Sequence, residues 1–292
     1  MISSIICQTL RYHSSYVLEG LYILRTVFQT DVCMDDKFDI QRVESRMAGR
    51  LIGCRVVHYQ TLSSTMDKAL KLASQGTPDG TIVSAEQQTE GRGRFNRVWR
   101  SNPGEDLLFS VILRPVASQL AFLNMAASLA VLATVTSYGI NKPVIKWPND
   151  VLVGAKKISG ILVEAELQPD GAANVIIGFG LNVNLDPSSH PDIAETTTSI
   201  NAEIGCKVDR TRVFTNLLEH FDDLCSQIWL GHSLTQRWSN ELETIGRNVR
   251  VGWKEQILEG RAVAVDDQGN LVLEHSDGTT TTVTAGEVTL RD

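Results

Sequence analysis

The residue types best suited to chemistry gather in the stretch GRGR at residues 91–94, which Arg97 and Arg100 follow. Arginine offers a planar fork of donors that matches carboxylates and phosphates, and it keeps its charge at neutral pH. Glycine admits backbone conformations that other residues avoid and lets a ligand come close. In an otherwise acidic chain this pattern predicts a local anion site, and the alternative is a solvated basic loop that binds nothing.

Two predicted strands and one helix would position this loop. Apolar runs at 81–85 and 107–113 bracket it, which favours a strand on each side. A helix is predicted over 66–75, with Ser64 or Thr65 as its N-cap. These hydroxyls could cap the helix and do nothing else, or they could also contact a ligand, because a helix N-terminus presents free amides.

A second group of motifs lies further along the chain. The runs PVIKWPNDVLV (143–153) and KISGILVEAEL (157–167) are separated by three residues, which predicts a hairpin. The run VIIGFGLNV (175–183) predicts another strand. In it Gly178 and Gly180 either leave room for a ligand to approach the backbone or form a bulge.

The remaining patterns predict helices and a small β domain. Helices are expected over 39–51, 118–138, 210–229 and 234–245, and the apolar helix 118–138 is expected to lie in the core. From Asn248 the pattern changes to short strands separated by DDQGN and SDG turns, which predicts a small β barrel.

Three regions are expected from these patterns. Residues 1–50 would form an N-terminal extension, residues 51–246 the main domain and residues 247–292 a C-terminal domain. Met34 precedes a more conventional amphipathic opening. We therefore predict that the natural start is Met34 and that the residues before it are artefactual or disordered.

Composition restricts the class of protein. A net charge of -7 and a pI near 5.4 argue against broad contact with nucleic acid, so no DNA partner is expected. The five cysteines are scattered and lack C-x-x-C spacing, which indicates neither a zinc site nor a disulfide framework and favours a reducing cytoplasm. We read no secretory signal and no apolar run of the ~20 residues that span a bilayer, so no membrane partner is expected.

Three motifs together make the sequence resemble the biotin protein ligases. They are EQQTEGRGRFNRVW, KWPNDVLVGAKKISGILVE and GFGLNVN, in the order and at the spacing of that family, and the resemblance runs from about Gly53 to the C-terminus. It implies an α+β fold of the class II aminoacyl-tRNA synthetase-like type, with a mixed sheet, helices against one face and a C-terminal SH3-like β-barrel. The short, weakly basic N-terminal region resembles the monofunctional group, which lacks a DNA-binding domain.

The resemblance also implies an activity. ATP and biotin would form biotinyl-5'-AMP, and biotin would then pass to a lysine of a biotin carboxyl carrier protein, with Mg²⁺ neutralising the phosphates. The alternatives are a lipoate ligase on the same fold, a non-catalytic biotin sensor or repressor, and an inactive binding module. A homodimer is left open.

The site residues follow from the matched motifs. Catalysis would rest on Lys157, Arg92 and Arg94. The resemblance implies biotin contacts from Ser64, Thr65, Gln88, Arg92, Gly93, Arg94 and Lys157. It implies ATP contacts from Arg97, Trp99, Lys146, Asn149, Asp150 and Asn182, with Asp150 also a candidate metal ligand.

Two positions depart from the family pattern. Met66 stands where many relatives have asparagine, which puts one hydrogen bond to biotin in doubt. Phe95-Asn96 replaces a glycine-bearing pair in the arginine loop and should stiffen it. Without the family match, Trp99 would be read as a core residue, and Lys157 as a solvated charge that spacing cannot distinguish from Lys156.

Overall fold

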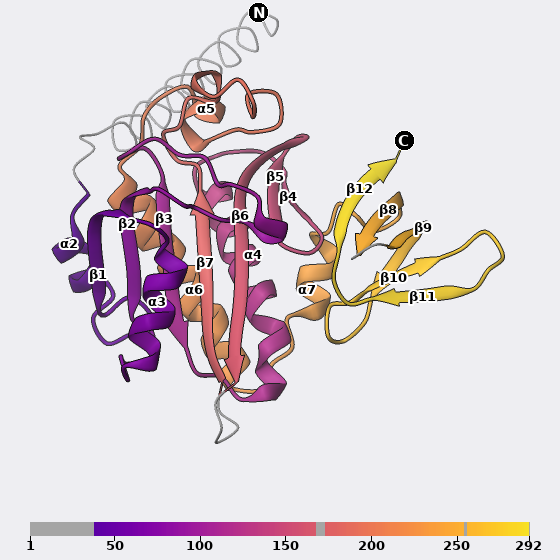
Figure 1. Ribbon diagram of the computed structural model, residues 1–292, viewed down its shortest axis with the longest axis horizontal. Coiled ribbons are helices and arrows are strands. Elements are labelled where there is room, and N and C mark those ends of the chain that lie inside the picture. The colour runs from indigo at the N-terminus through magenta and orange to yellow at the C-terminus, as the bar shows by residue number, and fades with distance from the viewer. Residues whose placement is uncertain (1–37, 168–172, 254–255, 292) are drawn as a thin grey trace, which may run out of the picture.

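The computed structural model describes residues 38–167, 173–253 and 256–291. The prediction that the chain starts at Met34, and that earlier residues are artefactual or disordered, lies outside these residues. Two β-sheets and the helices packed on them make up the described part (Figure 1).

The larger sheet has seven strands in the order β1-β2-β3-β7-β6-β5-β4. Its strands are β1 (Val56–Leu62), β2 (Ile82–Gln88), β3 (Leu107–Leu113), β4 (Pro143–Lys146), β5 (Asp150–Val153), β6 (Lys156–Leu167) and β7 (Ala173–Leu181). β1 and β2 run parallel, whereas every other pair of neighbours is antiparallel. The predicted mixed sheet is therefore confirmed.

Helices cover both faces of this sheet. α2 (Ile40–Arg46), α4 (Leu120–Ser137) and α6 (Arg210–Trp229) share one core cluster with the sheet, and α3 (Thr65–Ser74) packs in a second. In Figure 1, α3 lies in front of the strands and α4 and α6 lie behind them. The expectation of helices against one face only is wrong.

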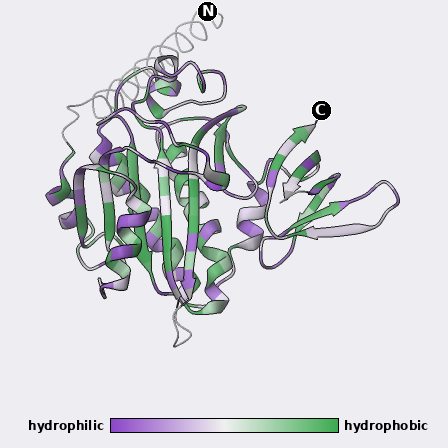
Figure 2. Ribbon diagram, viewed as in Figure 1, coloured by the Kyte–Doolittle hydropathy of each residue, from purple (hydrophilic) through white to green (hydrophobic). Residues whose placement is uncertain are grey.

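The reason lies in the alternation of side chains along each strand. Ile177 of β7 packs on the side of α4 and α6, whereas the adjacent residue, Ile176, packs on the side of α3. Both faces of the central strands are apolar, so each needs a cover. In Figure 2 much of β2 and β3 is green, β6 and β7 also carry white and purple stretches, and α3 has purple segments.

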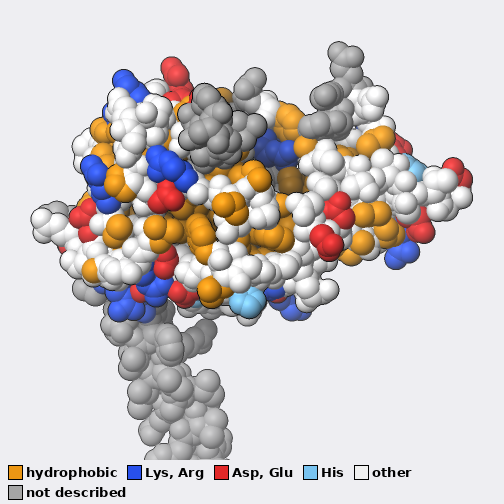
Figure 3. All heavy atoms as spheres, turned by 90° about the horizontal axis from the view of Figure 1, so that it is seen from below, with side chains coloured by type: hydrophobic (Ala, Val, Ile, Leu, Met, Phe, Trp, Pro, Cys, Tyr) orange, Lys and Arg blue, Asp and Glu red, His pale blue; other side chains and the backbone are white. Residues whose placement is uncertain are grey.

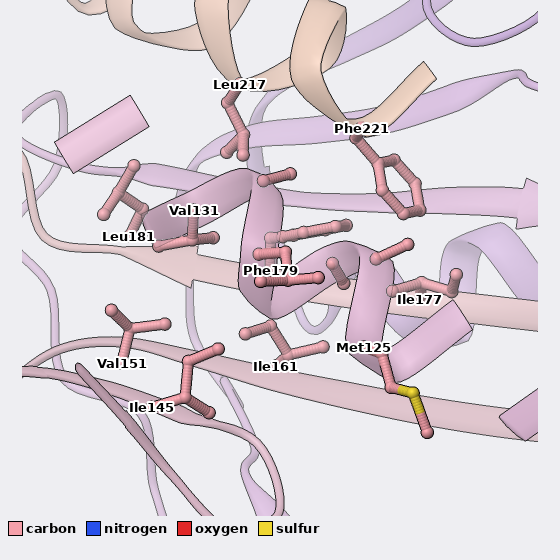
Figure 4. Close-up of a cluster of buried hydrophobic side chains, with 14 of the residues drawn as sticks. Met125, Val131, Ile145, Val151, Ile161, Ile177, Phe179, Leu181, Leu217 and Phe221 are labelled. Atoms are coloured by element: carbon pink, nitrogen blue, oxygen red, sulfur yellow. The ribbon is translucent and has the colours of Figure 1, made fainter. Parts of the chain in front are cut away.

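The main core lies between the sheet and the helices α4 and α6. Phe179 of β7 stacks on Phe109 of β3 with ring centroids 4.6 Å apart, and Phe214 and Phe221 of α6 meet these rings edge-on. Figure 4 shows Phe179 with Val131 of α4 and Leu217 and Phe221 of α6 in one cluster. Burying each such side chain contributes about 2 kcal/mol, which makes this sheet a rigid support.

α4 is long and apolar. Among the described residues, the helical segment Ala117–Ser137 is long and apolar enough to cross a membrane by length and composition. The sequence was expected to hold no apolar run of this length. In the structure α4 packs against α6 and the sheet, and Leu123, Ala126 and Ala130 are fully buried. The prediction of a core helix is confirmed, and shortly after its end Gly139 has a left-handed conformation.

The predicted hairpin of 143–153 and 157–167 has an additional break. β4 and β5 are separate strands joined through Trp147, Pro148 and Asn149, with a cis peptide bond before Pro148. Trp147 is held by tertiary contacts that the local pattern does not contain. Its backbone amide donates to Thr244 Oγ1 at 3.0 Å, and its indole Nε1 donates to the Gly269 carbonyl at 2.9 Å.

The helix predicted over 234–245 is shorter in the structure. α7 comprises Thr235–Asn240, and the following turn runs beside β4. The Ile145 amide donates to the Glu241 carbonyl, and the Glu243 amide donates back to the Ile145 carbonyl. These bonds satisfy β4 at the open edge of the sheet, so they end the helix early. A further short helix, α5 (Ile200–Ile204), follows the loop after β7.

The second sheet contains five antiparallel strands in the order β11-β10-β9-β8-β12. They are β8 (Asn248–Trp253), β9 (Gln256–Val265), β10 (Leu271–Glu274), β11 (Thr280–Val283) and β12 (Glu287–Arg291). In the described part of the chain, the edge strands β11 and β12 do not pair. The small β domain is confirmed, but the predicted barrel is not closed by its hydrogen bonds.

The described cysteines differ in state. Cys54 is exposed and free, Cys225 is buried and free, and Cys206 is disulfide-bonded. The scattered spacing did not predict the disulfide at Cys206. Cys225 belongs to the main core cluster, and its burial raises the pKa of the thiol well above the usual value.

Candidate active site

A cavity of about 490 Å³ opens on the face of the sheet that carries α3. It is bounded by the arginine loop between β2 and β3, the ends of β5 to β7, the loop before α5 and the edge of the C-terminal sheet. All thirteen predicted site residues line it. They are Ser64, Thr65, Gln88, Arg92, Gly93, Arg94, Arg97, Trp99, Lys146, Asn149, Asp150, Lys157 and Asn182.

The floor of the cavity is bare backbone. Gly160 of β6 pairs directly with Gly180 of β7, and the Trp99 indole lies against both. A Cβ atom on Gly180 would lie 2.5 Å from Trp99 Cε2, and one on Gly160 would lie 2.9 Å from Trp99 Cζ3. The pairing along β7 is regular, so the glycines provide close approach and the alternative of a bulge is wrong.

The arginine loop folds into a small hairpin over this floor. The Gly93 amide donates to the Arg97 carbonyl, and the Trp99 amide donates to the Gly91 carbonyl. Between them Phe95 has a φ of 55°, a strained conformation for a residue other than glycine. The loop therefore has a defined shape that places Trp99 inward and leaves the Phe95 side chain exposed.

Each of the first three arginines is bound to oxygen atoms of the protein. Arg92 Nη1 lies 2.7 Å from Asp67 Oδ1, and Arg92 Nη2 lies 3.0 Å from Glu164 Oε2. Asp67 of α3 and Glu164 of β6 thus both pair with the loop. Arg94 Nη1 donates to Asn149 Oδ1 at 3.3 Å and to the Gly286 carbonyl at 3.1 Å.

Arg97 reaches the C-terminal sheet, where it forms an ion pair with Glu287. Together with the bond from Arg94 to Gly286, this pair joins the loop to the second sheet. The sequence did not indicate that Gly286, Glu287 and Val288 would line the cavity. They lie far along the chain in a segment without a recognisable motif, so only the tertiary structure reveals them.

Lys157 stands at the start of β6 and faces Asp150 on β5. Its Nζ lies 2.7 Å from Asp150 Oδ1 and 5.4 Å from the centroid of the Trp99 ring. The exposed Lys156 is not among the residues that line the cavity. The geometry therefore distinguishes the two lysines, which their spacing in the sequence could not do.

The start of α3 forms the opposite end of the cavity. Ser64 is the N-cap of α3, and its side chain accepts from the Asp67 amide. The amide and the hydroxyl of Thr65 both donate to Gln88 Oε1, at 2.7 and 3.1 Å. These bonds fix the orientation of the Gln88 amide, so its nitrogen is the donor at the cavity.

Among the described residues, three buried polar atoms around the cavity have no hydrogen-bond partner. They are Trp99 Nε1, Arg92 Nε and Asn182 Oδ1. The Asn182 side-chain nitrogen is satisfied, because it donates to the Thr198 carbonyl at 2.9 Å. Buried polar groups nearly always have partners, so these atoms indicate a site that is completed by a polar ligand or by water.

The charges favour an anion. Among the described residues, six cationic side chains and two carboxylates line the cavity, an excess of four positive charges in a chain of net charge -7. Burial lowers the pKa of Arg94, and nearby Asp150 and Glu287 oppose that effect, so Arg94 stays protonated at neutral pH. On the face shown in Figure 3, by contrast, Lys and Arg side chains (blue) are interspersed with Asp and Glu (red) and hydrophobic ones (orange).

In the described part of the chain, no group of three or more His, Cys, Asp or Glu side chains could hold a metal ion. Asp150 and Glu287 are the carboxylates at the cavity. A single carboxylate suits Mg²⁺ that also binds the phosphates of a substrate, because Mg²⁺ commonly takes one or two protein carboxylates and keeps several waters. Asp150 therefore fits a metal that arrives with a nucleotide.

The site combines an excess of cationic side chains with a glycine floor, which defines a class of anion-binding site. Comparison with known proteins gives its family. Residues 57–182 match the biotin/lipoate A/B protein ligase family, and residues 244–291 match the biotin protein ligase C-terminal domain. The chain belongs to this ligase family.

Two curated relatives illustrate the similarity. The bifunctional ligase/repressor BirA of Bacillus subtilis is 36% identical over 78% of this chain and 72% of its own length. The biotin--[acetyl-CoA-carboxylase] ligase of Mycobacterium tuberculosis is 35% identical over 78% of this chain and 86% of its own length. The predicted monofunctional character concerns residues before 38, outside the described part, and stays a prediction.

Among solved structures, the biotin protein ligase of Aquifex aeolicus in complex with biotin and ATP is similar to this chain. It has a TM-score of 0.69 and 26% sequence identity, over 81% of this chain and 98% of that chain. The likeness supports the α+β fold and the predicted family. The roles of the individual site residues stay predictions.

Proposed function

We propose that this chain is a biotin protein ligase that forms biotinyl-5'-AMP from biotin and ATP and transfers biotin to a lysine of a carrier protein. Membership of the ligase family and the similarity to a ligase solved with biotin and ATP support this assignment. The observation that carries it is the convergence of Arg92, Arg94 and Lys157 on one cavity with a glycine floor.

The first step requires two anions to meet. A carboxylate oxygen of biotin attacks the α-phosphorus of ATP, the bond to the bridging oxygen breaks, and pyrophosphate leaves with the bonding electrons. The arginines and Lys157 lower the repulsion because their charges are fixed where the reacting oxygens must lie. Asp150 holds the Lys157 ammonium at the start of β6 until a ligand oxygen takes the place of the carboxylate.

The second step is acyl transfer. The neutral amine of the carrier lysine attacks the carbonyl carbon of the mixed anhydride, AMP leaves, and the amine loses a proton as the amide forms. Asp150 is the carboxylate beside Lys157 that could orient the incoming amine. No side chain of this chain need form a covalent bond to the substrate, so positioning supplies most of the rate.

The two ends of the cavity suit the two substrates. Thr65 and Gln88 form a fixed set of donors and acceptors at the α3 end, which fits the ureido ring of biotin. Asn182 Oδ1 and Trp99 lie toward the opposite end, where an unpaired acceptor and a flat ring fit adenine. Mg²⁺ would bind the phosphates and Asp150, and it would neutralise charge on the leaving group.

The carrier would be the biotin carboxyl carrier protein or domain of a biotin-dependent carboxylase. Relatives named for acetyl-CoA carboxylase support a carboxylase substrate. A cytoplasmic location and a homodimer are further parts of this proposal. Sedimentation of the purified chain with and without biotin and ATP would test the second of these.

The deciding experiment is exchange of labelled pyrophosphate into ATP by the purified full-length chain. Exchange that requires biotin is expected, followed by transfer of biotin to a carrier domain but not to the same domain with its acceptor lysine replaced by arginine. Exchange that requires lipoate would instead support the lipoate ligase alternative. Binding of biotin without exchange would support a sensor or a binding module.

A further inference from the structure

A buried carboxylate outside the cavity joins the two parts of the chain that carry the nucleotide-side residues. Asp106 precedes β3, is 3% exposed and is not among the residues that line the cavity. Its Oδ2 accepts from Ser101 Oγ at 2.8 Å, and its Oδ1 accepts from the Val183 amide at 2.8 Å. The first partner belongs to the arginine loop and the second follows β7.

Both partners are close neighbours of residues at the adenine end of the cavity. Ser101 lies two residues after Trp99, and Val183 directly follows Asn182. Trp99 rests on the glycine floor with an unpaired Nε1, and Asn182 has an unpaired Oδ1. A shift of either Ser101 or Val183 would therefore move one half of this end of the cavity relative to the other.

The surroundings of Asp106 hold its backbone in place. Arg210 of α6 donates from Nη1 to the Asp106 carbonyl at 3.4 Å and to Glu86 Oε2 at 2.8 Å. The neighbouring Glu105 carbonyl accepts from the Asn184 amide at 2.9 Å. The carboxylate thus projects from a fixed point on the sheet, and the more irregular chain at 101 and 183 is tied to it.

We propose that Asp106 is a positioning residue that holds Trp99 and Asn182 in the mutual arrangement required to bind the nucleotide. It touches neither substrate and acts through Ser101 and Val183. The link to ATP rests on the proposed function, whereas the link to the position of Trp99 does not. Biotin, which the α3 end would bind, should be affected much less.

The kinetic test compares four variants of the full-length chain, which are Asp106→Ala, Asp106→Asn, Ser101→Ala and the control Asp222→Ala. Asp106→Ala removes both acceptors and leaves the buried Val183 amide without its partner. It should raise the KM for ATP by about tenfold and the KM for biotin by less than about twofold. Asp106→Asn should restore both values. Its Oδ1 can accept from Val183 and its Nδ2 can donate to Ser101, whose hydroxyl can turn to the Asn102 carbonyl 3.2 Å away.

The matched control is Asp222→Ala. Asp222 is also buried, and its Oδ1 accepts from the Ile52 amide at 2.9 Å, but it does not line the cavity. This variant should lose stability and leave both KM values near those of the wild type. An equal rise in both KM values in Asp106→Ala, or the same selective rise in Asp222→Ala, would overturn the proposal.

A measurement independent of activity separates this proposal from the proposed function. In protein labelled with 5-fluorotryptophan, the ¹⁹F resonance of Trp99 is assigned by its loss in Trp99→Phe. Without any substrate, the chemical shift of this resonance should differ from the wild-type value in Ser101→Ala and Asp106→Ala. In Asp106→Asn it should equal the wild-type value. If the Trp99 resonance and the KM for ATP of Ser101→Ala both equal those of the wild type, the role of Asp106 is refuted. This outcome decides the question even if Asp106→Ala does not fold. A wild type without biotin-dependent exchange refutes the proposed function instead, and the resonance still decides the role of Asp106.

Discussion

Lys157 Nζ lies 2.7 Å from Asp150 Oδ1 across the hairpin of β5 and β6. Both side chains are partly exposed to the cavity, at 34% and 26%, so a ligand can reach either of them. An ion pair at such an accessible position contributes only about 0–1 kcal/mol to stability. The pair is therefore better explained by the need for a lysine held at a fixed place than by folding.

Lys157→Ala should reduce biotin-dependent ATP–pyrophosphate exchange by at least about a hundredfold, because the developing negative charge loses a fixed cation. The measurement is the initial rate of exchange at saturating substrates. Lys156→Ala is the matched control, since Lys156 is exposed beside the cavity without lining it. Exchange in Lys157→Ala that matches the control would contradict the assigned role.

Arg94→Ala should let the adenylate escape. Arg94 is half-buried between Asn149 and the Gly286 carbonyl, where its guanidinium can hold a ligand oxygen away from water. Loss of a charged hydrogen bond should speed release of biotinyl-5'-AMP by about tenfold, measured by rapid filtration after single-turnover synthesis. Arg94→Lys keeps the charge but lacks the fork, so an intermediate rate is expected. An unchanged rate in Arg94→Ala would rule out retention by this residue.

Glu287→Gln should lower the KM for ATP by up to about fivefold. Glu287 forms an ion pair with Arg97, which is predicted to bind the nucleotide phosphates. The Glu287 carboxylate and the phosphates therefore compete for the same guanidinium group. Glu274→Gln provides a control in the same sheet, because Glu274 is exposed and does not line the cavity. A higher KM in Glu287→Gln would mean that Glu287 positions Arg97 for the nucleotide instead of competing with it.

Several features could be predicted from the sequence because they depend on local pattern. The apolar run at 107–113 coincides with β3, and the amphipathic run at 210–229 coincides with α6. The site residues come together because each motif sits at the end of a strand or in a loop beside one. A motif carries both its residue types and its spacing, and the sheet then places them around one cavity.

Other features depend on contacts between distant segments, and local pattern does not contain them. Trp147 is held by Thr244 and Gly269, which divides the predicted first arm of the hairpin into β4 and β5. Gly286, one of the partners of Arg94, directly precedes β12 and is almost two hundred residues away, and Glu287, the partner of Arg97, begins that strand. Both faces of the sheet are apolar, and the period of two along a strand does not tell which helix covers which face.

Gly180→Ala should displace Trp99 from the floor of the cavity. The added Cβ would lie 2.5 Å from the indole, which must move, and affinity for ATP measured by calorimetry should fall by about tenfold. Gly252→Ala is a suitable control, because a Cβ at that position on β8 meets nothing within 4 Å. Wild-type affinity in Gly180→Ala would show that the contact between Trp99 and the glycine floor has no part in nucleotide binding.

The pH dependence of stability should depend on Asp106. Burial, opposed by the hydrogen bonds from Ser101 and Val183, raises the pKa of this carboxyl from 3.8 to about 7. Between these values the unfolded chain has lost the proton and the native protein keeps it, so stability falls as the pH rises and the loss is complete above pH 7. Asparagine has no such proton, so the wild type should lose up to about 4 kcal/mol relative to Asp106→Asn between pH 4 and pH 8. Urea unfolding of both proteins at several pH values measures this difference. A difference that does not change with pH would mean that Asp106 stays ionised in the folded protein, with the two hydrogen bonds outweighing burial.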